Sequence, residues 1–134
     1  MSRMEIVDKV AFIYLNDKTI LSTRSRDKDK YYIPGGKREH GETDIQTLVR
    51  EVKEELDVNI IESSAEFLGV YQAQAHGKKD GVIVKMTCYT ADFIGELKAS
   101  SEIAELVWLS YSDIELVSPV DKIIFLDLHK KGRL

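Results

Sequence analysis

The stretch GKREHGETDIQTLVREVKEELDV, residues 36–58, joins a glycine-containing loop to an amphipathic helix. Thr43 and Gln46 have the spacing of a capping box, which predicts a helix over residues 43–56. The apolar residues of this helix recur at helical period, at Ile45, Leu48, Val49, Val52 and Leu56. One side of the helix is therefore expected to pack against a core.

Three glutamates lie beside the apolar side of the predicted helix. Glu51, Glu54 and Glu55 are spaced three and four residues apart, so they are neighbours around the helix axis. Their carboxylates repel one another on a free surface, whereas a hard cation such as Mg²⁺ or Mn²⁺ between them makes a binding site. The three glutamates alone indicate either a metal site or a solvated acidic helix face.

Residues around these glutamates can complete a metal site. Glu42 stands one residue before the predicted helix cap, where its carboxylate could bind the metal or hold the loop. Gly36 lets the backbone approach closely, and its carbonyl is a candidate oxygen ligand. Arg50 lies four residues before Glu54 and could hold that carboxylate in place.

Together these residues resemble the signature of the Nudix (MutT-like) hydrolases. That signature runs Gly, five residues, Glu, seven residues, then Arg-Glu-aliphatic-x-Glu-Glu-x-Gly-aliphatic. The matching residues are Gly36, Glu42, Arg50, Glu51, Val52, Glu54, Glu55 and Val58. Asp57 stands where the family usually has glycine, at a helix end where a left-handed backbone is common. Aspartate reaches that conformation less easily than glycine does, and no ligand is lost.

The resemblance implies an α+β fold, an α/β/α sandwich with a Nudix-like mixed β-sheet flanked by helices, as one domain over residues 1–134. It implies Mg²⁺ as the cofactor, with Mn²⁺ as an alternative. The implied metal ligands are Gly36, Glu42, Glu51, Glu54 and Glu55, with Glu54 and Arg50 also acting in catalysis. The family also uses a glutamate before a late strand as a base or extra ligand; Glu102 is the candidate here and Glu105 the alternative, though both also fit ordinary loop charges.

The order of the other predicted elements agrees with a mixed sheet. Strands are expected at 9–15 and 19–25, joined by a turn at 16–18, and at 66–75, 82–93 and 105–109. Residues 31–33 predict a short extended piece, which Pro34 and two glycines interrupt. A short helix is expected at 111–116 and a last helix from Pro119 to about residue 131. Strands, helix, strands and helix in this order favour a sandwich with helices on both faces.

Composition narrows the class of protein. The 134 residues carry a net charge of −4, which disfavours a dedicated nucleic-acid-polymer binder. No apolar run reaches the length of a membrane span, and the start of the chain does not resemble a signal peptide. Cys88 is the single cysteine and is expected to be a buried, inert thiol. We expect a cytoplasmic protein without a membrane partner, as a monomer or a homodimer.

The implied reaction is metal-dependent hydrolysis of a nucleoside diphosphate linked to a group X. A nucleoside triphosphate or modified nucleotide, giving a monophosphate and pyrophosphate, is the preferred substrate. The alternatives are ADP-ribose or a nucleotide sugar, or a non-catalytic nucleotide sensor, which the intact set of glutamates disfavours. Arg24, Tyr32 and Trp108 are candidate substrate-binding residues, although packing explains Tyr32 equally well and is the better explanation for Trp108.

Overall fold

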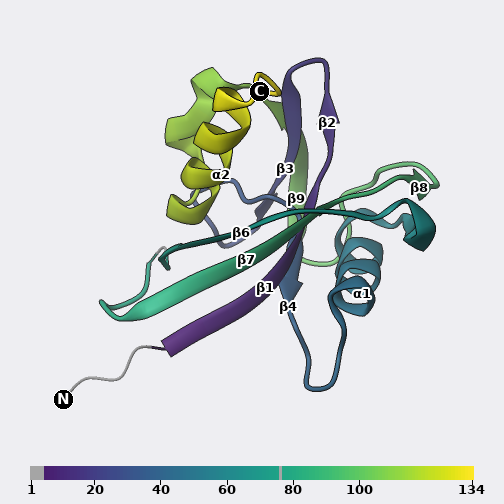
Figure 1. The fold of residues 1–134 in the computed structure, drawn as a ribbon, viewed down its shortest axis with the longest axis horizontal. Coiled ribbons are helices and arrows are strands. Elements are labelled where there is room, and N and C mark those ends of the chain that lie inside the picture. The colour runs from purple at the N-terminus through teal and green to yellow at the C-terminus, as the bar shows by residue number, and fades with distance from the viewer. Residues whose placement is uncertain (1–4, 76) are drawn as a thin grey trace.

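Two β-sheets, a two-stranded pair and two α-helices make up the fold of the computed structural model, which describes residues 5–75 and 77–134 (Figure 1). The larger sheet has the strand order β4-β1-β7-β6, with β4 at Gly35–Lys37, β1 at Glu5–Ile13, β7 at Val82–Thr90 and β6 at Glu66–Gln74. The smaller sheet joins β2 (Leu15–Asn16), β3 (Thr19–Ser25) and β9 (Ile103–Leu109), and β5 (Asn59–Ile60) pairs with β8 (Phe93–Ile94).

The larger sheet is mixed, as predicted. β1 pairs with β7 in parallel and with β4 antiparallel, and β6 pairs with β7 antiparallel. Helix α1 (Asp44–Leu56) and helix α2 (Pro119–Lys130) cover opposite faces of this sheet (Figure 1). Alternate residues of β1 divide between the two cores, since Val10 and Phe12 pack with α1 whereas Ala11 and Ile13 pack with α2. The predicted α/β/α sandwich is confirmed.

The predicted hairpin between residues 9–15 and 19–25 is correct only at its tip. β1 ends at Ile13, and the chain then crosses into the smaller sheet, where the two residues of β2 pair with β3. The turn uses positive φ angles at Asp17 and Lys18. β1 instead pairs along its length with β7, 77 residues later in the chain, and the second half of β1, from Val10 to Ile13, is buried on both faces.

Both ends of α1 form as the local sequence predicts. Thr43 caps the helix and exchanges capping-box hydrogen bonds with Gln46, at 3.1 and 3.0 Å. Asp57 takes the left-handed conformation, with φ 57° and ψ 37°, and its side chain pairs with Lys53 at 3.1 Å. The aspartate therefore fills the place of the usual glycine without disrupting the helix end.

The predicted helices at 111–116 and from Pro119 form, whereas the predicted strand at 82–93 is divided, because β7 ends at Thr90 and Phe93 belongs to β8, which pairs with β5. Ser110 caps a 3₁₀-helix, η2, at Tyr111–Leu116, and Pro119 occupies the first turn of α2. A second 3₁₀-helix, η1, covers Glu62–Ser64. Gly35 and Gly36, which were expected together with Pro34 only to break the pattern, instead begin β4, the short edge strand beside β1.

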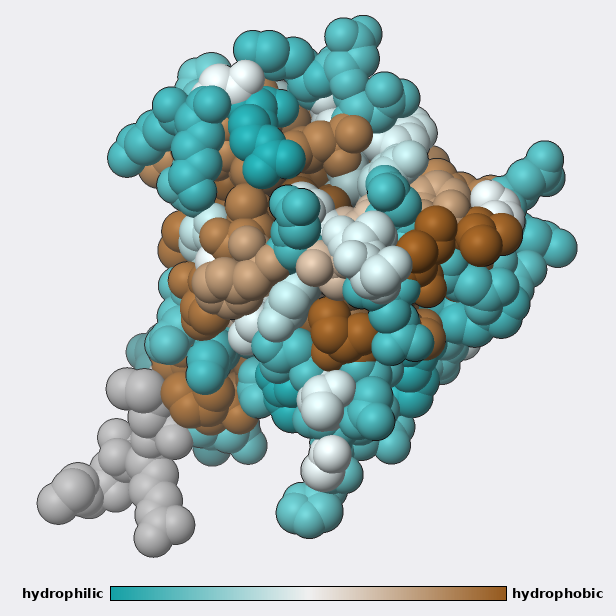
Figure 2. Space-filling model, turned by 45° about the vertical axis from the view of Figure 1, so that its right-hand side comes forward, coloured by the Kyte–Doolittle hydropathy of each residue, from teal (hydrophilic) through white to brown (hydrophobic). Residues whose placement is uncertain are grey.

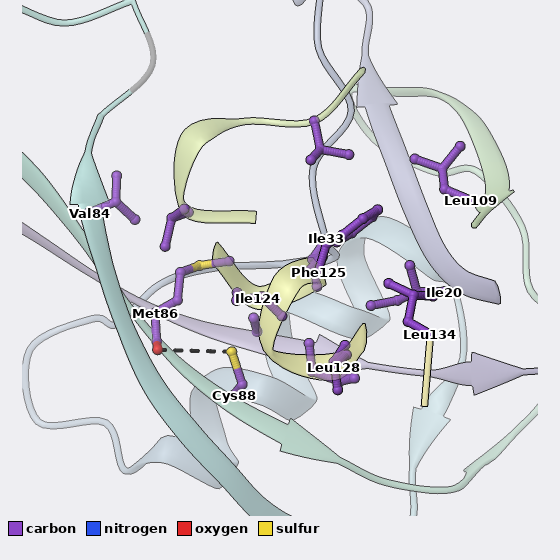
Figure 3. Packing of buried hydrophobic residues seen from close by; sticks show 14 of the residues in the cluster. Ile20, Ile33, Val84, Met86, Cys88, Leu109, Ile124, Phe125, Leu128 and Leu134 are labelled. Atoms are coloured by element: carbon purple, nitrogen blue, oxygen red, sulfur yellow. Dashed lines mark hydrogen bonds between the residues drawn. The ribbon is translucent and has the colours of Figure 1, made fainter. Parts of the chain in front are cut away.

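The core under α2 contains the single cysteine. Ile124, Phe125 and Leu128 of α2 face Met86 and Cys88 of β7 (Figure 3). Cys88 is fully buried, and burial raises the pKa of its thiol, so it is the inert core residue that was predicted.

The described surface has no single continuous apolar face in the view of Figure 2, where apolar patches alternate with polar residues. The large apolar side chains that are most exposed are Ile6, Phe67, Val70, Ile94, Trp108, Leu116, Ile123 and Leu126. Among the described helices, none is long and apolar enough to span a membrane.

Candidate metal and substrate site

A cavity of about 450 Å³ lies where the two sheets, α1 and the start of α2 meet. Residues from all of these elements line it: Val7, Lys9, Thr23, Ser25, Lys28, Tyr32, Ile33, Gly35, Gly36, Lys37, Glu51, Glu55, Gln74, Ala75, Lys78, Val84, Met86, Glu102, Ser118, Pro119 and Val120. The cavity therefore brings the loop–helix motif together with strands and a helix that are distant in sequence.

Glu51, Glu55 and Glu102 form the acidic end of this cavity. Glu55 is only 8% exposed, and burial raises the pKa of its carboxyl to about 8, although the N–H of Gly35 donates to it at 2.9 Å. Burial also raises the pKa of Glu51, against the opposing effect of Arg50. The charge of Glu102 raises both pKa values further. A cation at this end would relieve both the burial cost and the repulsion.

Two glycines allow the backbone of β4 to lie directly against these carboxylates. A Cβ on Gly36 would meet the carboxylate carbon of Glu51 at 2.3 Å. Gly35 has φ +143°, and a Cβ there would meet the main-chain oxygen of Val10 at 2.1 Å. The acidic end can therefore form only when both positions lack a side chain.

Arg50 holds the loop and the helix together. Its guanidinium makes two bonds of 2.8 Å to the carboxylate of Glu42, one of 2.8 Å to Glu51, and one of 2.9 Å to the carbonyl of Lys37. The hydrogen bonds of Arg50 lower the pKa of Glu42 to about 2, with help from the N–H of Glu39 and the hydroxyl of Thr47. Both oxygens of Glu42 are thus used to anchor the loop.

The predicted pairing of Arg50 with Glu54 does not form in the structure. The side chain of Glu54 is exposed and lies outside the cavity lining, while Arg50 turns toward Glu42 and Glu51. The reason is that two partly buried carboxylates meet the guanidinium on the loop side of the helix, where they offer more hydrogen bonds than a solvated Glu54.

Glu102 and Glu105, the two candidates for the base, lie in different surroundings. Glu102 lines the cavity, whereas Glu105 on β9 faces Arg24 on β3, with an ion pair of 3.2 Å, and also accepts a hydrogen bond from the hydroxyl of Tyr31. Arg24 is consequently held away from the cavity. Of the other predicted substrate residues, Tyr32 lines the cavity, while Trp108 is 41% exposed outside it and packs on the ring of Tyr14.

Two charged residues near the cavity were not singled out by the sequence. Asp121 on α2 is fully buried: one oxygen accepts the N–H of Ile33 at 2.8 Å, and the other has no partner among the described residues. Burial raises the pKa of this carboxyl to about 7. Lys9 on β1 lines the cavity itself, and burial lowers the pKa of its ammonium against the attraction of Asp121 and Glu55. The sequence signal was weak, because each residue has a charged neighbour, Asp8 beside Lys9 and Lys122 beside Asp121.

A hard divalent cation fits the donor set at the acidic end. Within residues 5–75 and 77–134, no three His, Cys, Asp or Glu side chains already converge as a coordination group. The donors that line the cavity are nevertheless carboxylates beside a backbone free of side chains at Gly36, which is the chemistry that Mg²⁺ and Mn²⁺ prefer.

Comparison with known proteins places the chain among proteins of one family. The family model for the NUDIX domain matches residues 7–127. The chain is 32% identical over 111 residues to the CTP pyrophosphohydrolase of Escherichia coli (strain K12), covering 80% of this chain and 78% of that protein. It is 29% identical to the E. coli ORF135 protein, whose solution structure matches with a TM-score of 0.73 over 94% of this chain and 92% of that one. The MutT protein from Methanosarcina mazei Go1 shares the fold over both full chains, with a TM-score of 0.79 at 19% identity.

Proposed function

Since this chain belongs to the Nudix family of hydrolases, we propose that it is a divalent-metal-dependent pyrophosphohydrolase that cleaves a nucleoside triphosphate or a modified nucleotide to a monophosphate and pyrophosphate. The observation that carries the proposal is the acidic end of the cavity, where Glu51, Glu55 and Glu102 face a glycine strand. We further propose that the described elements act as one domain.

The proposed metal ligands are Glu51 and Glu55, joined by Glu54 and the carbonyl of Gly36. When bound, the metal would polarise phosphoryl oxygens and lower the pKa of a water. Arg50 orients Glu51 through its 2.8 Å bond, and Glu42 holds Arg50 in that position rather than binding metal. This division of roles follows from the hydrogen bonds that already occupy Glu42.

Glu102 is the proposed general base. Its carboxylate lines the same cavity as Glu51 and Glu55 but comes from the loop before β9, so it reaches the substrate from another side. A carboxylate in that place can accept a proton from the attacking water as the bond to phosphorus forms. Tyr32, which lines the same cavity, is the proposed substrate-binding aromatic residue.

The charge of the cavity supports an anionic nucleotide substrate. Among the described lining residues, four lysines (Lys9, Lys28, Lys37 and Lys78) face three glutamates. With the proposed ligand Glu54 and one divalent cation included, the net charge is positive by two. A positive lining of this kind attracts a phosphate-bearing substrate. The name of the E. coli relative, CTP pyrophosphohydrolase, points to the same substrate class.

A substrate panel with Mg²⁺ tests the proposal. The panel includes CTP, the other nucleoside triphosphates, modified nucleotides, ADP-ribose and a nucleotide sugar, with products identified by mass. We expect a monophosphate and pyrophosphate from a triphosphate, no turnover with a chelator, and loss of turnover in Glu55→Gln. Binding without turnover across the whole panel would instead support a nucleotide sensor, and turnover of ADP-ribose alone would support the alternative substrate.

A further inference from the structure

Lys9 points into the substrate cavity from the centre of the larger sheet. Its neighbours Val7 and Ala11 pack on the α2 side of the sheet, and Lys9 shares their face because strand side chains alternate. In register it lies between Lys37 of β4 and Met86 of β7, both of which also line the cavity. Lys9 therefore lies between the half-buried Val7 and the buried Ala11 on one face of the strand.

The chain provides this ammonium with attraction but no hydrogen bond. Asp121 from α2 and Glu55 from α1 attract it, and Lys37 and Lys28 repel it. Its Nζ lies 5.9 Å from the centre of the Tyr32 ring, and among the described residues no ion pair or hydrogen bond reaches it. A desolvated charge without a hydrogen-bonding partner is costly, and an apolar side chain here would pack at lower free energy.

We propose that Lys9 is a specificity-determining residue that donates a hydrogen bond to an oxygen of the bound nucleotide. The inference rests on the proposed function, because it places the nucleotide in this cavity. Lys9 lines the same cavity as the acidic end, so the oxygen that it binds is one that a nucleotide in this cavity presents to β1. That oxygen belongs either to a phosphate or to a carbonyl of the base.

A structural role for Lys9 predicts different behaviour from a binding role. If Lys9 served only to offset the charge of Asp121 or Glu55, its removal would change the stability of the free protein and leave nucleotide affinity unchanged. If it binds substrate, affinity falls even in a variant whose stability is intact. Lys85 provides a matched control, because it is also a half-buried lysine on the adjacent strand but lies outside the cavity lining.

The test measures binding by titration calorimetry with Mg²⁺, using α,β-methylene CTP, which resists cleavage at that bond. We expect Lys9→Met to bind this probe about 10- to 100-fold more weakly, as for loss of a hydrogen bond to a charged group. Lys9→Arg should retain most of the affinity, and Lys85→Met should bind like the native protein. Thermal unfolding followed by circular dichroism verifies that each variant is folded, and Lys9→Gln replaces Lys9→Met if the latter unfolds.

Tripolyphosphate and cytidine distinguish the two oxygen sources. Loss of tripolyphosphate affinity in Lys9→Met assigns the contact to a phosphate, and loss confined to probes that carry the base assigns it to the base. A folded Lys9→Met protein that binds every probe within about twofold of the native affinity overturns the inference while leaving the proposed function intact. A native protein that neither binds nor cleaves any nucleotide overturns both.

Discussion

Replacing Gly36 with alanine should disable the site while leaving the fold intact. The new Cβ would lie 2.3 Å from the carboxylate carbon of Glu51 and 2.5 Å from each of its oxygens. Ordinary contact between such atoms needs about 3.5 Å, so the carboxylate must move by roughly 1 Å. A displacement of that size at a reacting centre costs on the order of a hundredfold in rate. We therefore expect kcat/KM to fall about a hundredfold in Gly36→Ala.

The effect on stability should be much smaller, because Glu51 can rotate away at the cost of its bond to Arg50. The assay compares kcat/KM on CTP with Mg²⁺ and the free energy of unfolding from urea titration. Gly41→Ala is the backbone control, since Gly41 has φ +82° but open space around it. We expect that variant to lose stability through left-handed strain and to keep kcat/KM within a few-fold.

A double mutant identifies the cause. Glu51→Asp withdraws the carboxylate by one methylene, so adding Gly36→Ala to it should cost far less than in the native background. Two effects that simply add would contradict the steric explanation, since residues in contact are expected to be non-additive. A folded Gly36→Ala variant with kcat/KM within about threefold of the native value would also contradict the steric explanation.

Three further predictions concern the charged residues. Arg50→Lys cannot hold Glu42 with two parallel bonds, so steady-state kinetics should show kcat/KM about 10- to 100-fold lower; unchanged kinetics would exclude the positioning role. Glu102→Gln should lower kcat by about a hundredfold or more. Glu105→Gln is the control and should keep kcat within a few-fold, because the partner of Glu105, Arg24, lies outside the cavity. A larger loss of kcat in Glu105→Gln than in Glu102→Gln would instead assign the base to Glu105. Burial raises the pKa of Asp121 to about 7, whereas an aspartate in the unfolded chain has a pKa of about 3.9. Between these values the folded protein keeps a proton that the unfolded chain has released. The contribution of Asp121 to the free energy of unfolding therefore falls as the pH rises from about 4 to 7. Urea unfolding at several pH values should therefore show a shallower decline in Asp121→Asn, and an unchanged slope would refute the assignment.

The local features of the site are predictable because they depend on residues close in sequence. A helix fixes the geometry of positions three and four apart, so the capping box at Thr43 and the placement of Glu51 with Glu55 follow from spacing alone. The left-handed conformation of Asp57 follows from its place after the last helical turn. Such contacts need no information about the rest of the fold.

The partners of charged side chains were less predictable. Spacing allowed Arg50 to hold Glu54, yet the loop brings Glu42 closer and with better geometry. The sequence offered Glu102 and Glu105 as two candidates for the same base. The pairing of β3 with β9 places Glu105 beside Arg24, whereas Glu102 lines the cavity. Local sequence does not specify which of several nearby charged residues forms the ion pair, because that depends on how deeply each one is buried in the folded protein.

The sequence by itself determined the loop–helix motif, its acidic face and the order of most strands and helices, because each is a short-range periodic or spacing property. Only the tertiary structure decided that β1 pairs in parallel with β7, and that Lys9 and Asp121 therefore approach one cavity from segments over a hundred residues apart. Those contacts depend on which apolar faces bury each other, and many chain arrangements satisfy the same local pattern. The proposed metal-binding half of the site thus comes from residues close together in sequence, while the half that we propose selects the substrate is assembled by folding.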